Sequence, residues 1–129
     1  MKPKIIELDY TYKKEGQEVW VLDLDDVPID KSLVADQRIV HLAPKSLGGN
    51  HKHQRSEWLI GIGEDLIFAW LDADNNLHEE QMHPDGKIRL IIVPPQVPHA
   101  VVNKSAEKVG VLFEFSDSKS SEVEKVQVV

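Results

Sequence analysis

Short apolar runs separated by turn residues constrain the fold of this chain more than any other feature of its sequence. Seven prolines and seven glycines are spread along the 129 residues and divide them into many short segments. That spacing is typical of short strands joined by turns, as in a β-sandwich or a β-barrel. We therefore expect an all-β protein whose strands cover residues 5–10, 18–22, 38–42, 49–53, 58–62, 66–71, 77–83, 88–93, 98–102 and 109–115.

The segments between these strands carry few helix signals. Residues 72–76 and 84–86 are rich in Asp, Asn, Pro and Gly, so we expect each to join two strands as a hairpin connection. Residues 30–38 offer a helix start with some apolar spacing, for which we expect at most a turn or two. The tail at 116–129 opens with small polar residues and ends in an apolar run, which leaves an extra strand and a flexible end as alternatives.

Length and charge bound the class of protein. A chain of 129 residues fits a single domain, which we place at residues 1–129. Its 22 acidic and 15 basic side chains give a net charge of −7, which argues against a nucleic-acid polymer as partner, because phosphate affinity rests on clustered Lys and Arg. No segment matches a signal peptide or the roughly 20 apolar residues of a membrane span. We expect a cytoplasmic protein with no membrane partner.

The chain has six histidines and no cysteine, so a metal site would have to use nitrogen and oxygen ligands. His51 and His53 lie two residues apart on an expected strand and would present two imidazoles to one surface. Glu57 would lie roughly 20 Å from His51 on a straight strand, whereas metal bonds are only about 2 Å long. The chain must therefore turn at residues 54–56, after which Glu57 opens the neighbouring strand and can reach back to the histidines.

A fourth candidate ligand is His99, which lies in a segment rich in proline. Pro94, Pro95 and Pro98 precede it and would give a rigid entry into the next strand. Such an entry suits a site that must hold one imidazole steadily. The sequence therefore predicts a metal site formed by three histidines and one carboxylate: His51, His53, Glu57 and His99.

These residues resemble the two sequence motifs of the cupin superfamily. The first motif, His-x-His followed after three or four residues by Glu, is matched by His51, His53 and Glu57. The second, Pro, four residues, His, three residues and Asn, is matched by Pro94, His99 and Asn103. The resemblance covers about residues 38–115 and implies a jelly-roll barrel in which the matching histidines and glutamate bind one divalent metal.

The match departs from the motifs at three glycines. The opening glycine of the first motif is displaced to Gly48 or Gly49, and its closing glycine falls one position early, at Gly63. In the second motif, Gln96 stands where a glycine is expected. These departures concern the turns around the site and leave the ligand set intact.

Residues 49–53 and 57–60 look most like the cupin domains of capsular and deoxysugar biosynthesis, which epimerise or isomerise keto-sugars linked to nucleotides. The resemblance thus implies a sugar or nucleotide-sugar as the small-molecule substrate. In the metal-dependent version the ion would polarise a keto oxygen and stabilise the enediolate left by proton removal. In related sugar ketoisomerases without metal, the residues matching His51 and His53 act as catalytic acid and base.

Two other functions use the same ligands. An iron-dependent dioxygenase would bind oxygen and a small molecule at open positions on the metal. A binding module would hold a sugar or small ligand without chemistry. The absence of thiolates favours zinc, iron, manganese or nickel as the ion. Unprotected strand edges and the frequency of two-fold symmetry favour a homodimer in each case.

Further residues could contact the substrate. Either face of the strand at 38–42 could line the pocket, so Arg38 and His41 are alternative candidates. Trp70 is the aromatic residue with the best claim to a substrate contact. We expect Arg55 to face solvent, and His78 and His83 to lie on a solvated edge strand outside the site.

Overall fold

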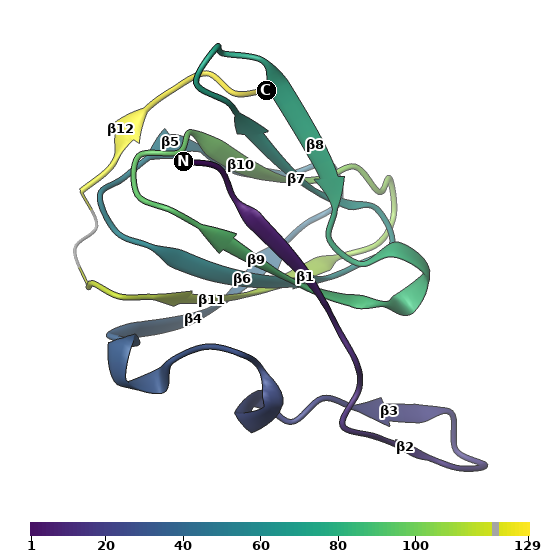
Figure 1. Cartoon of the computed structure of the whole chain (residues 1–129). Coiled ribbons are helices and arrows are strands. Elements are labelled where there is room, and N and C mark those ends of the chain that lie inside the picture. The colour runs from purple at the N-terminus through teal and green to yellow at the C-terminus, as the bar shows by residue number, and fades with distance from the viewer. Residues whose placement is uncertain (120–121) are drawn as a thin grey trace.

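The computed structural model describes residues 1–119 and 122–129, and two facing antiparallel sheets form most of it (Figure 1). The first sheet has the order β1 (Lys4–Leu8), β9 (Ile88–Val93), β6 (Glu57–Ile62), β11 (Gly110–Ser116) and β4 (Asp36–Leu42). The second has the order β12 (Glu124–Lys125), β5 (Leu47–Lys52), β10 (His99–Asn103), β7 (Leu66–Leu71) and β8 (Leu77–Gln81). A small hairpin of β2 (Tyr12–Lys14) and β3 (Val19–Val21) projects from the sandwich.

The prediction of an all-β fold is confirmed, and the described residues contain no α-helix. No ladder joins the two sheets within the described part of the chain, so the sandwich is not closed into a barrel. Each of the ten expected strands overlaps an observed one. The strand β2 was not expected, since its residues are exposed and carry no apolar alternation.

The core lies between the sheets. Leu59, Phe68 and Ile91 are buried there with exposures of 1% or less. Trp58 and Ile60 point to the opposite face of β6, where partly buried side chains of the segment before β4 cover them. Alternate residues of β6 therefore belong to different cores, as the two-residue period of a strand requires.

Hairpin connections were expected at residues 72–76 and 84–86, and the structure has a hairpin only at the first. The residues between β7 and β8 form the expected hairpin, in which the Asp72 carboxylate accepts hydrogen bonds from two backbone N–H groups of the turn. The prediction of a hairpin at 84–86 is wrong, because the 3₁₀ turn η3 (Pro84–Gly86) joins β8 to β9, which belong to different sheets. Turn chemistry identified the bend but not which strands it joins.

The segment with the weak helix signal, residues 30–38, and the C-terminal tail contain little regular secondary structure. One 3₁₀ turn, η2 (Lys31–Leu33), forms in the region of the helix signal, after a similar turn, η1 (Leu24–Asp26). In the tail, β12 pairs with β5, and Val128 is buried against the outer face of the second sheet. Across the residues that the model describes, no helix is long and apolar enough to cross a membrane.

Candidate metal centre

His51, His53, Glu57 and His99 lie together between the two sheets. Each offers one ligand atom, and these four atoms lie within 4.8 Å of one another. His53, Glu57 and His99 are buried, and His51 is half-buried. The three imidazole centroids lie 5.0 to 5.2 Å apart, so the rings form a compact triangle around the carboxylate.

The sheets bring the four residues together from both sides of the core. His51 lies near the end of β5, where its side chain points to the inner face of the sheet, and it pairs with His99 at the start of β10. The chain then crosses to the first sheet, where Glu57 begins β6, which pairs with β9 and β11 and not with β5. Glu57 thus opens a strand and its carboxylate reaches the histidines, as expected, but that strand lies in the opposite sheet and is not the neighbour of β5.

Gly49 allows β5 to approach β10 at the site. Its φ is +116°, and a Cβ built there would lie 2.8 Å from Ala100 Cα and 2.9 Å from the carbonyl oxygen of His99. No other residue type fits that space or that backbone conformation without strain. Next to it, the register shifts: His99 and Ala100 pair with His51 and Gly49, which leaves Asn50 as an extra residue on β5.

Backbone carbonyls fix the orientation of two imidazoles. The Nδ1 atom of His53 lies 3.1 Å from the Arg55 carbonyl oxygen, and the Nδ1 atom of His99 lies 2.8 Å from the Val97 carbonyl oxygen. Since a carbonyl only accepts, each Nδ1 carries a proton, and the lone pair of a neutral ring is then on Nε2. This is the tautomer in which a histidine binds metal through Nε2.

The same two Nε2 atoms face one carboxylate oxygen. Glu57 Oε1 lies 2.9 Å from Nε2 of His53 and 3.2 Å from Nε2 of His99. Two neutral rings would direct lone pairs at an anion here, so the cluster requires either extra protons on the rings or a cation between them. The donor set, three nitrogens and one carboxylate, suits a borderline divalent metal.

Burial and charge shift the acidities within the cluster. Burial alone would raise the pKa of the Glu57 carboxyl, but hydrogen bonds from His53 and His99 outweigh it and hold that pKa well below its usual range. Burial, together with the positive forms of His99 and His53, lowers the pKa of His51 to about 4. Both shifts favour a deprotonated ligand set, as metal binding requires.

Two charged residues complete the surroundings. Arg55 does not face solvent as expected: its side chain is 7% exposed and donates to the Glu57 carboxylate at 3.0 Å. Its guanidinium also lies 3.4 Å from Glu114, a residue of β11 that the sequence analysis missed. Burial, and then the nearby Glu57 charge, raises the pKa of Glu114 to about 7. The alternation of β11 alone would have put Glu114 among core positions, with no signal for a functional carboxylate.

A cavity of about 120 Å³ opens beside the cluster, and Glu114 shares its lining with His51, Glu57 and His99. The pairing of β4 with β11 shows on which face of β4 each of the two candidate substrate contacts lies. Arg38 pairs with Glu114 and lies on the inner face, where its charge reaches that carboxylate. His41 pairs with Val111 on the outer face, and neither Arg38 nor His41 is among the residues that line this cavity.

Trp70 lies beside the cluster without lining its cavity. It pairs with His99 across β10 and β7, and with His78 across β7 and β8. The pairs place His51, His99, Trp70 and His78 in one row on the inner face of the second sheet. His78 thus lies on the edge strand, as expected, but packs its imidazole on Trp70, at 4.3 Å between ring centroids.

The remaining motif residues shape the backbone. Asn103 is 1% exposed, and its amide nitrogen donates to the carbonyl oxygens of Leu42, Ala43 and Lys108, which ties β10 to β4 and to the loop before β11. Gln96 has a φ of 68°, the left-handed conformation that explains why a glycine is expected there. Its N–H donates to the His53 carbonyl oxygen at 2.7 Å, so this turn also supports the histidine cluster.

Solved structures of other proteins resemble this chain in fold. No protein-family model matches the chain, and no curated protein sequence does. Similar solved structures include the dTDP sugar isomerase from Desulfovibrio desulfuricans G20, with a TM-score of 0.75 and 17% identity over 98% of this chain and 84% of that one. They also include the epimerase RmlC from Legionella pneumophila Philadelphia 1, solved with dTDP-4-keto-L-rhamnose, with a TM-score of 0.68 and 12% identity over 92% of this chain and 68% of that one.

The capsular polysaccharide assembling protein CapF from Staphylococcus aureus is a third similar structure, with a TM-score of 0.61 and 12% identity over 72% of this chain. The match covers 27% of CapF, so this chain corresponds to about a quarter of that protein. Cupin-domain proteins are among the similar structures as well. The chain therefore has the cupin fold, with a group of three histidines and one glutamate that could hold a metal ion.

Proposed function

We propose that the chain binds one divalent metal ion through His51, His53, Glu57 and His99 and epimerises or isomerises a keto-sugar carried on a nucleotide. One observation carries this proposal: two Nε2 atoms converge on the Glu57 carboxylate, although the other nitrogen of each ring already donates to a carbonyl. That arrangement suits a cation held among the four side chains. Zinc, iron, manganese and nickel all fit the donor set.

A bound ion would act as a Lewis acid on a keto oxygen, which makes the neighbouring C–H bond more acidic. The chain's own contribution is a carboxylate beside the site. Glu114 lines the cavity next to His51 and His99 but is not one of the four ligands. Its position makes it our candidate for the base that removes a proton from the substrate carbon and returns one to it.

The cavity limits how the substrate can bind. At about 120 Å³ it is smaller than pockets that hold a drug-sized ligand, so it admits the reacting carbons and not a whole nucleotide-sugar. The nucleotide would have to lie outside it, near the inner face of β4. Arg38 is half-exposed there, and we propose it as the cation that meets the diphosphate.

The experiment that tests this proposal is solvent-deuterium exchange. Metal-loaded protein is incubated in D₂O with a panel of dTDP-linked keto-sugars, and deuterium at the carbons next to the ketone is followed by NMR. We expect incorporation with the wild-type protein and none with Glu114→Gln, whose metal content should be unchanged. Glu64→Gln, at an exposed position, is the matched control and should exchange normally.

Other outcomes would reject the proposal and identify an alternative. Exchange that persists after complete metal removal and is lost in His51→Ala would assign acid and base roles to His51 and His53. Iron with substrate-dependent oxygen uptake would indicate a dioxygenase. Sugar binding without exchange across the whole panel would indicate a binding module.

The assembly and location are separate proposals. A homodimer formed through unprotected strand edges is the assembly we propose, and light scattering of the purified protein would test it. The cytoplasm is the compartment we propose, because nucleotide-sugars would be processed where they are made. Fractionation of cells that express the chain would test that.

A further inference from the structure

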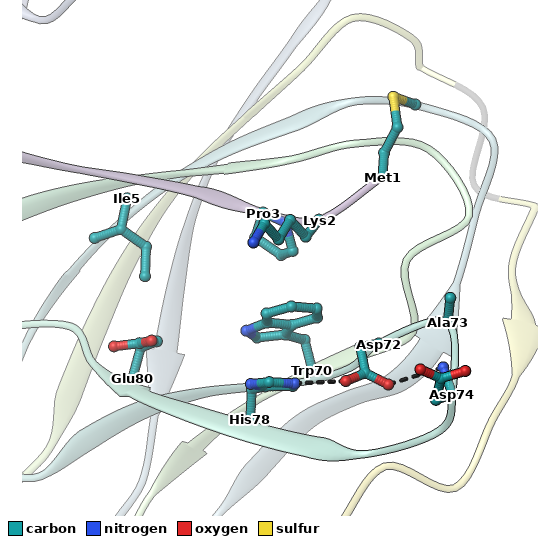
Figure 2. A pocket seen from close by; sticks show the side chains of 10 residues that line it. All are labelled: Met1, Lys2, Pro3, Ile5, Trp70, Asp72, Ala73, Asp74, His78 and Glu80. Atoms are coloured by element: carbon teal, nitrogen blue, oxygen red, sulfur yellow. Dashed lines mark hydrogen bonds and ion pairs between the residues drawn. The ribbon is translucent and has the colours of Figure 1, made fainter.

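A second cleft lies at the β8 edge of the sandwich, and one of its lining residues, Trp70, pairs with His99 of the metal centre. It has a volume of about 630 Å³ and lies between the N-terminal segment and the hairpin of β7 and β8 (Figure 2). Its lining includes Pro3, Ile5, Trp70, His78 and Glu80, and it shares no residue with the lining of the cavity beside Glu57. A cleft of this size can hold a small ligand.

Trp70 forms the rigid wall of this cleft. The imidazole of His78 packs against its indole with an interplanar angle of 14°. In Figure 2, Pro3 lies on the other side of the indole. His78 is itself fixed by a hydrogen bond of 2.8 Å from Nε2 to Asp72, whose carboxylate also accepts from the backbone N–H groups of the hairpin turn. The wall is therefore preorganised rather than mobile.

Two polar groups at this cleft, the Trp70 indole and the Glu80 carboxylate, have no hydrogen-bond partner among the described residues. Trp70 is 7% exposed, and no hydrogen bond joins its indole Nε1–H to any other described residue; this nitrogen is not among the fully buried polar atoms, so it is accessible to solvent. Figure 2 shows this nitrogen pointing toward the space that Ile5 and Glu80 flank. The Glu80 carboxylate likewise has no hydrogen bond or ion pair within the described part of the chain. A ligand in the cleft can therefore bond to both groups in place of the water that solvates them.

Charge limits which ligand can supply that acceptor. The carboxylates of Asp72, Asp74 and Glu80 line the cleft against a single lysine, Lys2, so a phosphate or carboxylate group would be repelled. An ammonium group could pair with Glu80 but has no lone pair for the indole N–H. A hydroxyl group both accepts and donates, so it can satisfy Trp70 and Glu80 together.

We propose that this cleft binds a neutral polyhydroxylated ring, a monosaccharide unit, with one hydroxyl accepting from Trp70 Nε1–H and donating to Glu80. Ile5 and Pro3 supply the apolar surface for the C–H faces of the ring. The cleft carries no ligand of the metal centre, so the proposal does not depend on the reaction proposed above. It adds a carbohydrate-binding site to a protein whose metal centre lies elsewhere in the same sandwich.

The test follows the indole N–H signal of Trp70 by ¹⁵N NMR, with the signals of Trp20 and Trp58 as internal references and Trp70→Phe used only for assignment. The probes are methyl β-D-glucopyranoside, methyl α-D-mannopyranoside and methyl α-L-rhamnopyranoside, compared with choline and inorganic phosphate. We expect a saturable shift of the Trp70 signal with at least one glycoside and none with choline or phosphate.

Matched variants on one strand complete the test. Glu80→Gln should weaken glycoside binding at least fivefold, whereas Glu79→Gln, on the opposite face of β8, should not change it. His51→Ala should also leave binding unchanged, which separates this site from the metal centre. The proposal is overturned if no glycoside shifts the Trp70 signal, if choline or phosphate shifts it, or if Glu80→Gln binds as the wild type does.

Discussion

Glu57 Oε1 lies 3.2 Å from Nε2 of His99, so a carboxylate of one sheet meets an imidazole of the other inside the core. The same carboxylate accepts a hydrogen bond from Arg55 through its second oxygen. Glu57 therefore joins the two sheets and balances the positive charges around it. A metal ion bound at this point would link the two sheets through four side chains.

Replacing Glu57 with glutamine should affect both the fold and metal binding. The amide keeps the size of the side chain but removes the buried charge that Arg55 faces. We expect the metal-free protein to lose about 2 to 3 kcal/mol in free energy of unfolding, measured by urea denaturation in EDTA. Metal affinity should fall at least about 100-fold, measured by competition with a chromogenic chelator.

The control for this change is Glu64→Gln, which alters an exposed carboxylate. Its stability should stay within about 0.5 kcal/mol of the wild type and its metal affinity should not change. Equal effects of the two variants would contradict the role given to Glu57.

Gly49→Ala should destabilise the protein by about 2 to 3 kcal/mol, because a Cβ there meets the backbone of β10 and the left-handed φ adds strain. Gly48→Ala is the matched control, since its Cβ would meet only the Leu42 side chain at 3.6 Å. Thermal and urea unfolding of both variants would measure the difference. A Gly49→Ala protein as stable as Gly48→Ala would show that β5 and β10 do not approach as described.

Gln96→Gly should stabilise the protein by about 0.5 to 1 kcal/mol. Gln96 holds a left-handed φ of 68° that glycine adopts without strain, and its N–H to the His53 carbonyl would be kept. Gln54→Gly, at an exposed position outside the positive-φ residues, should instead lose stability. Urea denaturation measures both, and a loss of stability in Gln96→Gly would contradict the strained turn.

His51 should make the metal-free protein less stable as the pH is lowered from about 6.5 to about 4, while Glu114, whose pKa burial raises to about 7, acts in the opposite direction below pH 7. Burial lowers the pKa of His51 to about 4, so in this window the unfolded chain binds a proton that the folded chain does not. Across this window the wild type should therefore lose stability relative to His51→Gln, which keeps the Glu114 contribution, and urea denaturation in EDTA at each pH measures the difference. An unchanged pH dependence in that variant would show that His51 is not the group responsible.

Much of the site could be predicted from sequence because its information is local. His51 and His53 lie two residues apart, His51 on β5 and His53 just past its end, and the turn before Glu57 follows from the reach of a side chain. The prolines before His99 similarly predict a fixed entry into a strand. These arguments needed no knowledge of which strands pair.

What could not be predicted depends on pairing between distant segments. Glu114 resembles an ordinary strand residue, and only the register of β11 with β4 and β6 brings it beside the cluster. Arg38 and His41, on opposite faces of their strand, were equivalent candidates until that register showed which face points inward. The burial of Arg55 depends on two carboxylates, one of them 59 residues away, and periodicity carries no such information.

The most direct test of the metal centre is elemental analysis of the protein purified without chelators, beside His51→Ala prepared in the same way. The account predicts about one divalent ion per chain in the wild type. The folded variant, with an unchanged circular dichroism spectrum, should hold much less than one. A wild-type protein without metal, or a folded variant that retains a full ion, would contradict the central claim.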